Sequence, residues 1–430
     1  MKNRDFLFLL FGATAFFAAV SYALQLSTNA TAIQFVGGDP ISYWEASKLI
    51  YTEGSKPHPL RPFFYPFLIG FPSLFFGEKG FNLAWALGLN VIFWLSTVGF
   101  IFQILKENAN RKIAFIGAFI FVTNTSNIIN CWAVLAESLF HFLIIGSVYF
   151  FTKYITNKTN TEYISAFFAF FCLSLITRPT YFPLIFILIP LFVWTIYKRY
   201  LSAFITVIFL LIFTFTIGFS VFKMHKTYGN YTLSYLGNCA LYSFFGAYAK
   251  GAKMDKTWEQ INADWRVEST ARSKKMARYH DSISWSSLPP LVDADLKEQL
   301  RDNKMGLMLT FCRDLLSNST ASNGDVLNLI NFDNRPFFGF ILRGVFFWSR
   351  LQNVLNSLVA LLMPLLFLRH KSYFWSKNRV VYWLLGVNCA LSLFAVLISA
   401  VSFSQGDRFH LVVLPLTLVS LGVVYFSYKK

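Results

Sequence analysis

Residues 36–71 carry the sequence VGGDPISYWEASKLIYTEGSKPHPLRPFFYPFLIGF, and the interpretation of the whole chain starts from this stretch. It follows the first long apolar run and combines acids, bases and clustered aromatic residues. Asp39 and Pro40 predict a helix start, because Asp is a good N-cap and Pro at the first helical position has no N–H to leave unpaired. The pattern predicts a short amphipathic helix over residues 41–52, which ends at Gly54.

The composition around this loop is that of a membrane protein. Of 430 residues, 55% are hydrophobic and only 14% are charged, whereas a soluble domain carries roughly a quarter charged residues. Repeated apolar runs of about 20 residues predict a polytopic protein in a lipid bilayer. The net charge of +17 falls largely at the ends of these runs. The positive-inside rule explains such a distribution, so we expect no nucleic-acid partner.

We expect an all-α bundle of about ten transmembrane helices with both termini in the cytoplasm. The first external loop (25–80) would hold interfacial helices, because the apolar run 63–76 is too short to cross and must lie in or re-enter the interface. The expected spans are 5–24, 81–105, 113–129, 138–151, 163–176, 181–197, 201–222, 337–368 (with an interfacial piece), 380–403 and 409–428.

Three parts follow from this pattern: an N-terminal transmembrane module (1–222), an external region (223–336) and C-terminal transmembrane helices (337–430). The external region carries Trp residues among mixed charges, which favours a small helical unit. Its Asp293-Ala294-Asp295 motif could suggest a metal and a nucleotide sugar. We favour acids in a first helical turn, where they suit the helix dipole. Cys239 and Cys312 share this region and could form a disulfide in an oxidising compartment.

The ordered elements of the loop resemble a known family. Asp39, Tyr43 and Ala46 are followed by Arg61-Pro62-Phe63-Phe64-Tyr65-Pro66. This order resembles the first external loop of the GT-C glycosyltransferases, multi-pass enzymes that take a sugar from a polyprenyl-phosphate carrier. It is similar to the aminoarabinose and mannosyl transferase-like families and to O-antigen-modifying glucosyltransferases. Phe63 stands where the family pattern has a second Pro. The resemblance covers the chain to about residue 222 and the last external turn.

The resemblance implies an inverting transfer, which needs a general base on the acceptor hydroxyl and positive groups on the departing phosphate. Asp39 is the expected base, although helix capping alone also explains an Asp there. Glu137 is the second acidic candidate, and Glu45 is a weaker one because it points away from Tyr43. No residue is assigned as a metal ligand, and a divalent cation stays open as a cofactor.

The expected substrate-binding residues are aromatic, acidic or basic groups near span ends. They are Tyr43, Glu45, Arg61, Tyr65, His141, Arg178, Arg343, Arg350 and Arg408. We expect one of the five arginines to contact the lipid-linked phosphate, since Arg binds phosphate oxygens bidentately. The alternative is interfacial anchoring, which is common for Arg at span ends. Phe409 replaces a Tyr of the family's late Arg-Tyr element.

The expected function is transfer of a sugar from a polyprenyl-phosphate donor to a glycan or glycolipid acceptor, in polysaccharide or lipopolysaccharide (O-antigen) modification. The expected site is the periplasmic face of a bacterial inner membrane. Two alternatives stay open: a transporter or flippase of lipid-linked sugars, and an O-antigen polymerase. The absence of repeated halves speaks against the transporter, and the order of the loop elements favours the glycosyltransferase.

The predicted topology can be tested by labelling. Cys introduced at Ser55 or Ser273 should react with an impermeant thiol reagent applied to the periplasmic side, because both positions lie in predicted external segments. The measurement is labelling in intact spheroplasts compared with lysed ones. Labelling that appears only after lysis would reverse the orientation and exclude a periplasmic site.

Overall fold

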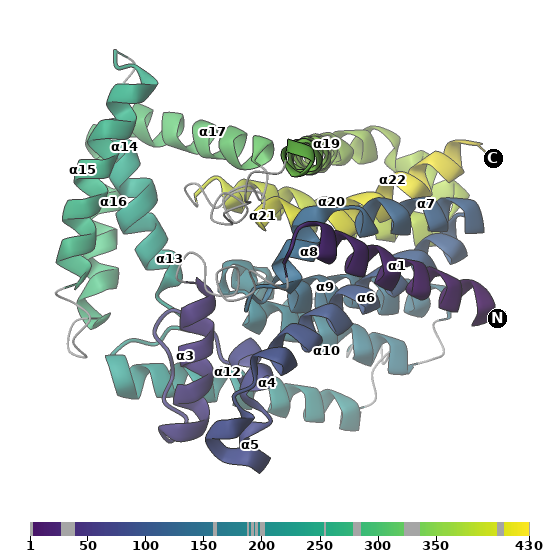
Figure 1. The fold of residues 1–430 in the computed structure, drawn as a ribbon, viewed down its shortest axis with the longest axis horizontal. Helices are drawn as coiled ribbons and strands as arrows, with labels where there is room; N and C mark the ends of the chain where they lie inside the picture. Colours follow the sequence, from purple (N-terminus) through teal and green to yellow (C-terminus); the bar gives the residue numbers. More distant parts are fainter. Residues whose placement is uncertain are drawn as a thin grey trace.

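The computed structural model describes residues 3–26, 39–157, 161–186, 203–252, 255–277, 285–321, 336–401 and 408–429, with isolated positions at 189, 190, 193 and 197. Every regular element in these ranges is a helix (Figure 1). The second half of the expected span 181–197, the first part of the loop at 27–38, and Gly406-Asp407 lie outside the described residues.

The first group of described helices precedes the long polar region. They are α1 (Asn3–Ala23), α3 (Asp39–Thr52), α4 (Phe64–Gly70), α5 (Ser73–Phe76), η1 (Gly77–Gly80), α6 (Leu83–Asn108), α7 (Arg111–Val122), α8 (Thr125–Cys131), α9 (Glu137–Thr156), α10 (Thr161–Thr177), η2 (Pro179–Leu184) and α12 (Ala203–Tyr228).

The remaining helices form a polar group and then the C-terminal part of the bundle. They are α13 (Leu236–Cys239), η3 (Ala240–Gly246), α14 (Ala247–Gly251), α15 (Trp258–Ala277), η4 (Trp285–Ser287), α16 (Leu288–Asp302), α17 (Lys304–Thr320), α19 (Pro336–Lys377), α20 (Arg379–Ser399), α21 (Arg408–Leu411) and α22 (Leu414–Lys429).

The chain is an all-helical, polytopic membrane protein. Within the described residues, five helices are long and apolar enough to cross a membrane, and six if one bent pair is counted as a span. The five are Arg4–Ala23, Leu83–Asn108, Glu137–Thr156, Arg343–Ser376 and Arg379–Ser399. Two expected spans appear as shorter apolar helices, Thr161–Thr177 and Leu414–Tyr428. Since α12 is described only in part at the level of side chains, the expected total of about ten is not decided by this count.

Two expected spans are broken rather than continuous. The expected span 113–129 bends by 58° between Val122 and Thr125. The reason is local, because the Asn124 side chain accepts a hydrogen bond from the Asn127 N–H and so caps a new helix. The expected span 409–428 is likewise divided into α21 and α22. In contrast, α19 continues past residue 368 to Lys377, with a kink at His370 (φ −111°).

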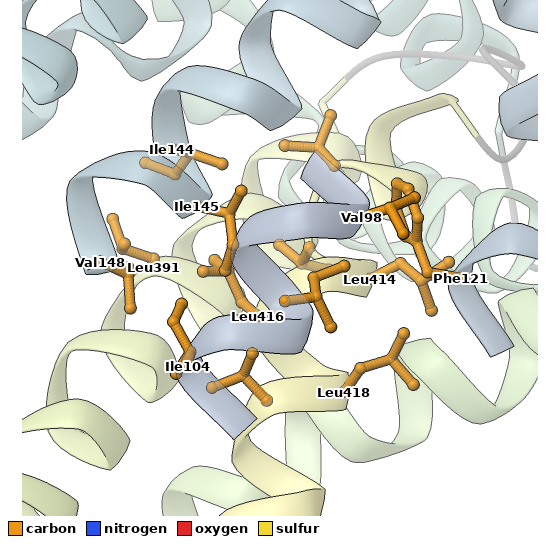
Figure 2. Packing of buried hydrophobic residues seen from close by; sticks show 14 of the residues in the cluster. Val98, Ile104, Phe121, Ile144, Ile145, Val148, Leu391, Leu414, Leu416 and Leu418 are labelled. Atoms are coloured by element: carbon orange, nitrogen blue, oxygen red, sulfur yellow. The ribbon is translucent and has the colours of Figure 1, made fainter. Parts of the chain in front are cut away.

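The core forms where α6, α9, α20 and α22 pack together. Figure 2 shows Ile104, Ile145 and Leu416 from three of these helices meeting in one cluster. Helices α6 and α22 approach closely at Gly422, where a Cβ atom would lie 2.5 Å from Leu105. In Figure 1 these helices run side by side, and both chain termini lie at the same end of the bundle. The elements of the first loop gather toward the other end.

The loop forms the predicted helix. Helix α3 spans Asp39–Thr52 and lies across the direction of the long helices (Figure 1). It ends as expected at Gly54, whose φ of +66° is a left-handed conformation that favours glycine. The run 63–76 forms the two short helices α4 and α5, which is consistent with a segment that does not cross.

The region between α12 and α19 is helical, as expected. Its Asp293 and Asp295 lie inside α16 rather than in its first turn, which corrects the dipole explanation. Asp293 pairs with Lys297 (2.6 Å), and Asp295 accepts two hydrogen bonds from Arg272 (2.8 Å each). The motif is therefore held by cations of its own region. Cys239 is buried, Cys312 is exposed, and both are free thiols.

Candidate active site

Asp39 and Arg61 form the first charged pair of the site. Asp39 is the first residue of α3, and the loop after the helix returns Arg61 to it, so that Nη2 of Arg61 donates to the Asp39 carboxylate. The Nε of Arg61 also donates to Ser42 Oγ at 2.6 Å. The Arg61 side chain is only 4% exposed, whereas that of Asp39 is 28% exposed. A buried guanidinium thus holds a carboxylate that solvent can still reach.

Two tyrosines pack next to the Asp39–Arg61 pair. The Arg61 guanidinium lies 4.6 Å from the centre of the Tyr43 ring, a cation–π contact. Tyr43 in turn packs edge-on against Tyr65, with 5.2 Å between the ring centres. The Tyr65 hydroxyl donates to Asn90 in α6 (3.2 Å), and the Asn90 amide donates to the Ala133 carbonyl (2.8 Å). This chain of contacts fixes the loop on the bundle.

Glu137 and Arg178 form the second pair, at the ends of α9 and α10. Arg178 Nη2 lies 3.8 Å from Glu137 Oε1, and both side chains are less than a tenth exposed. The guanidinium also lies over the Phe140 ring at 5.7 Å. Glu137 occupies the first turn of α9, where an acid interacts favourably with the helix dipole.

Tyr43 connects the two pairs. Burial raises the pKa of the Tyr43 hydroxyl, and the charges of Arg61, Glu137, Arg178 and Asp39 all act on it. The two arginines lower this pKa, and the two carboxylates raise it. All four charged groups therefore lie within electrostatic reach of one phenol, and their formal charges cancel.

The weaker acidic candidate lies outside this cluster. Glu45 is 61% exposed on the opposite side of α3, as the helical spacing predicts, and its carboxylate is 3.9 Å from His58. His58 itself is nearly buried, and its Nδ1 accepts a hydrogen bond from the Leu60 N–H at 3.1 Å. Burial, with the nearby Arg61 charge, lowers the pKa of His58 to about 4. A neutral His58 therefore holds the backbone just before Arg61.

The other predicted site residues differ in how close they lie to the Tyr43 cluster. His141 is buried one turn after Glu137 and lies against the backbone of Leu411, which brings α21 close to the start of α9. Arg343 and Arg350 are exposed on α19, and no contact joins them to the Tyr43 cluster in the described part of the chain. Arg408 begins α21, and its side chain lies outside the described residues.

Three supporting residues were missed by the sequence analysis. Ser42 holds Arg61, and Asn90 holds Tyr65. His410 holds α21, because its two ring nitrogens each lie 2.6 Å from a hydroxyl, those of Ser357 and Ser399. Asn90 could have been found from the sequence, since an amide inside an apolar run needs a hydrogen-bond partner. Nothing in the sequence around Ser42 indicates its role.

The described residues contain no group of three or more His, Cys, Asp or Glu side chains placed to hold a metal ion.

Comparison with known proteins gives two similar structures. The crystal structure of ArnT from Cupriavidus metallidurans in the apo state matches with 13% identity and a TM-score of 0.35, covering 96% of this chain and 78% of that one. The same protein bound to undecaprenyl phosphate matches with 13% identity and a TM-score of 0.34 over the same shares. No protein-family model and no curated protein sequence matches. These figures assign no substrate and no residue role to this chain.

The Glu137–Arg178 pair predicts coupled effects on stability. Glu137→Gln and Arg178→Gln should each lower the free energy of unfolding by about 3–5 kcal/mol, because each removes one partner of a buried ion pair. The double variant should lose less than the sum by about 0.5–3 kcal/mol. Unfolding in mixed micelles titrated with SDS measures these values. The exposed Asp293–Lys297 pair is the control, with a coupling of about 0.3–0.5 kcal/mol. Additive effects at Glu137 and Arg178 would contradict the pairing.

His58 predicts a dependence of stability on pH. Its folded-state pKa of about 4 lies below the unfolded value of about 6.5, so the unfolded state binds the proton more readily. This contribution to stability is complete above about pH 6.5 and decreases as the pH falls toward 4. His58→Asn, whose amide oxygen can accept from Leu60, should flatten the melting temperature measured across this range. An unchanged pH profile in that variant would show that other groups cause the dependence.

Proposed function

We propose that this protein is an inverting glycosyltransferase of the GT-C type. It moves a sugar from a polyprenyl-phosphate carrier to a glycan or glycolipid acceptor at the external, periplasmic face of a bacterial inner membrane. The product belongs to cell-surface polysaccharide or lipopolysaccharide. The observation that carries the proposal is the cluster of two carboxylates and two arginines around Tyr43, placed where the first loop packs on an apolar bundle.

In the proposed reaction, the Asp39 carboxylate accepts the proton of the acceptor hydroxyl. The hydroxyl oxygen forms a bond to the anomeric carbon of the donor sugar from the side opposite the phosphate. The bond between that carbon and the phosphate oxygen breaks, and its electron pair stays on the departing phosphate. A single carboxylate serves this inversion, since no covalent intermediate on the enzyme is needed. The partial exposure of Asp39 gives an acceptor access to it.

The arginines supply the positive charge that the departing phosphate needs. Because the four charges of the cluster cancel, an arginine that exchanges its carboxylate partner for phosphate oxygens would supply positive charge to the phosphate. Arg61 suits this exchange, because its planar guanidinium is already desolvated and held by Ser42. When Arg61 turns to the donor phosphate, the Asp39 carboxylate loses that one counter-charge and becomes a better proton acceptor. Donor binding would thus activate the base.

Glu137 and Arg178 complete the proposed site from the bundle side. Their pair lies in an apolar environment, where fixed charges act more strongly than in water. Arg178 would stabilise the phosphate charge as it develops, and Glu137 with His141 would orient sugar or acceptor hydroxyls. Tyr43 and Tyr65 present aromatic faces and edges between the two pairs.

Asp39→Asn tests the proposed base. Asn keeps the size of the side chain and an oxygen that can accept from Arg61, but it cannot take up a proton at neutral pH. Transfer should fall by roughly 10²–10⁴-fold, while donor binding and folding persist. The measurement is transfer of radiolabelled sugar from a polyprenyl-phosphate donor by the purified protein.

The matched control is Asp5→Asn. Asp5 also pairs with an arginine, Arg111, at 2.7 Å, but at the end of the bundle that holds the termini. Transfer by this variant should stay near the native rate. A near-native rate for Asp39→Asn would instead move the base to Glu137 and then to Glu45. If the protein instead moves the lipid-linked sugar across the membrane of vesicles and transfers no sugar, the protein is a transporter and the proposal is wrong.

A further inference from the structure

A groove lies between α6, α7 and α22. Helices α7 and α22 reach the end of the bundle that holds both chain termini (Figure 1). Its volume is about 410 Å³, within the roughly 300–1,000 Å³ of small-molecule sites. The walls are apolar and largely open to the surroundings, as shown by Ile116 on α7 and Leu421 on α22, which are 50% and 43% exposed. The floor is the side chain of Leu105.

Two glycines line the groove beside Leu105. A Cβ atom at Gly117 would lie 2.4 Å from Leu105, and one at Gly422 would lie 2.5 Å from it. Because neither glycine has a side chain, Leu105 of α6 can pack against the backbone of both α7 and α22. The lining residues run along α7 from Lys112 to Ile120 and along α22 from Leu418 to Tyr425.

One end of the groove carries a positive charge that forms no ion pair with any of the described residues. In the same part of the bundle, Arg111 pairs with Asp5 at 2.7 Å and Lys153 pairs with Glu107 at 2.7 Å. Lys106 lies 5.6 Å from the centre of the Phe102 ring. Lys112 lines the groove, is exposed, and makes no ion pair within the described residues. It stands one helical turn before Ile116, on the same face of α7.

We propose that this groove binds an anionic phospholipid, with an acyl chain between α7 and α22 and the headgroup phosphate at Lys112. The apolar walls alone would not select a lipid, because any lipid tail is as apolar as the leucines that it contacts. Selection therefore has to come from the charge at the end of the groove, and the lining residues include no acid that would repel a phosphate. Basic pockets between membrane helices recognise anionic headgroups in this way. This site is separate from the proposed catalytic cluster.

Native mass spectrometry of the full-length protein in detergent tests the proposal. The protein is titrated with dioleoyl phosphatidylglycerol and, separately, with dioleoyl phosphatidylcholine. We expect the first phosphatidylglycerol to bind about five-fold more tightly, the effect of one lysine near a lipid phosphate. Lys112→Gln should remove this preference, because it lowers the affinity for phosphatidylglycerol more than that for phosphatidylcholine, whose choline cation offsets the phosphate charge. Ile116→Trp, which places a larger side chain in the groove, should weaken the binding of both lipids.

Lys371→Gln is the matched control. Lys371 is an exposed lysine of α19 that does not line the groove, so this variant should keep the preference. The proposal is overturned if Lys112→Gln keeps the preference, or if Lys371→Gln loses it equally and the effect is one of general surface charge. It is also overturned if Ile116→Trp releases a second copy of the chain rather than lipid, because the groove would then be a dimer interface.

Discussion

Two buried guanidinium groups set the main constraint on this structure. Arg61 and Arg178 have side chains that are 4% and 9% exposed, and arginine cannot lose its charge to escape burial. Each therefore requires an acid nearby, and each has one. The Arg61–Asp39 pair positions the first loop, and the Arg178–Glu137 pair joins α10 to the start of α9. The arrangement of the candidate site follows from satisfying these two charges.

Neutral polar side chains inside the bundle also need partners, as the buried arginines do. In a low-dielectric interior, an amide that lacks a partner is costly, so amides inside the spans reach across to neighbouring helices. Asn90 joins α6 to the Ala133 carbonyl, and Asn388 joins α20 to Ser420 of α22 at 3.0 Å. Thr417 donates to Asn356 at 2.6 Å and so joins α22 to α19. These bonds hold neighbouring helices of the bundle in defined positions relative to one another. The break at Asn124 is held by Gln352 of α19, whose side-chain oxygen accepts from the Asn124 amide at 2.7 Å.

The two ends of the bundle use charge in different ways. At the loop end, acids and arginines are matched, buried and neutral in sum, which suits a reaction in which partners are exchanged. At the end that holds the termini, basic residues are in excess, and Lys112 lines an apolar groove without an ion pair to any residue that the structure describes. The candidate site is thus balanced in charge, whereas the surface at the other end is suited to anionic lipid.

Local signals in the sequence determined the membrane class, the helical content, the helix of the first loop and its end at Gly54. They also selected most of the residues that meet around Tyr43, although not their roles. Such features depend on side-chain type and on spacing over one or two turns. The partners were decided only by the tertiary structure. Arg61 was one of five arginines expected to offer a phosphate contact, and the structure pairs it with Asp39, 22 residues away. Asn90 supports Tyr65 from another helix. The acids of the D-x-D motif proved to be held by Lys297 and Arg272. A buried charge takes the counter-charge that helix packing places beside it, and packing is set by the whole apolar surface of the bundle rather than by any one stretch of sequence.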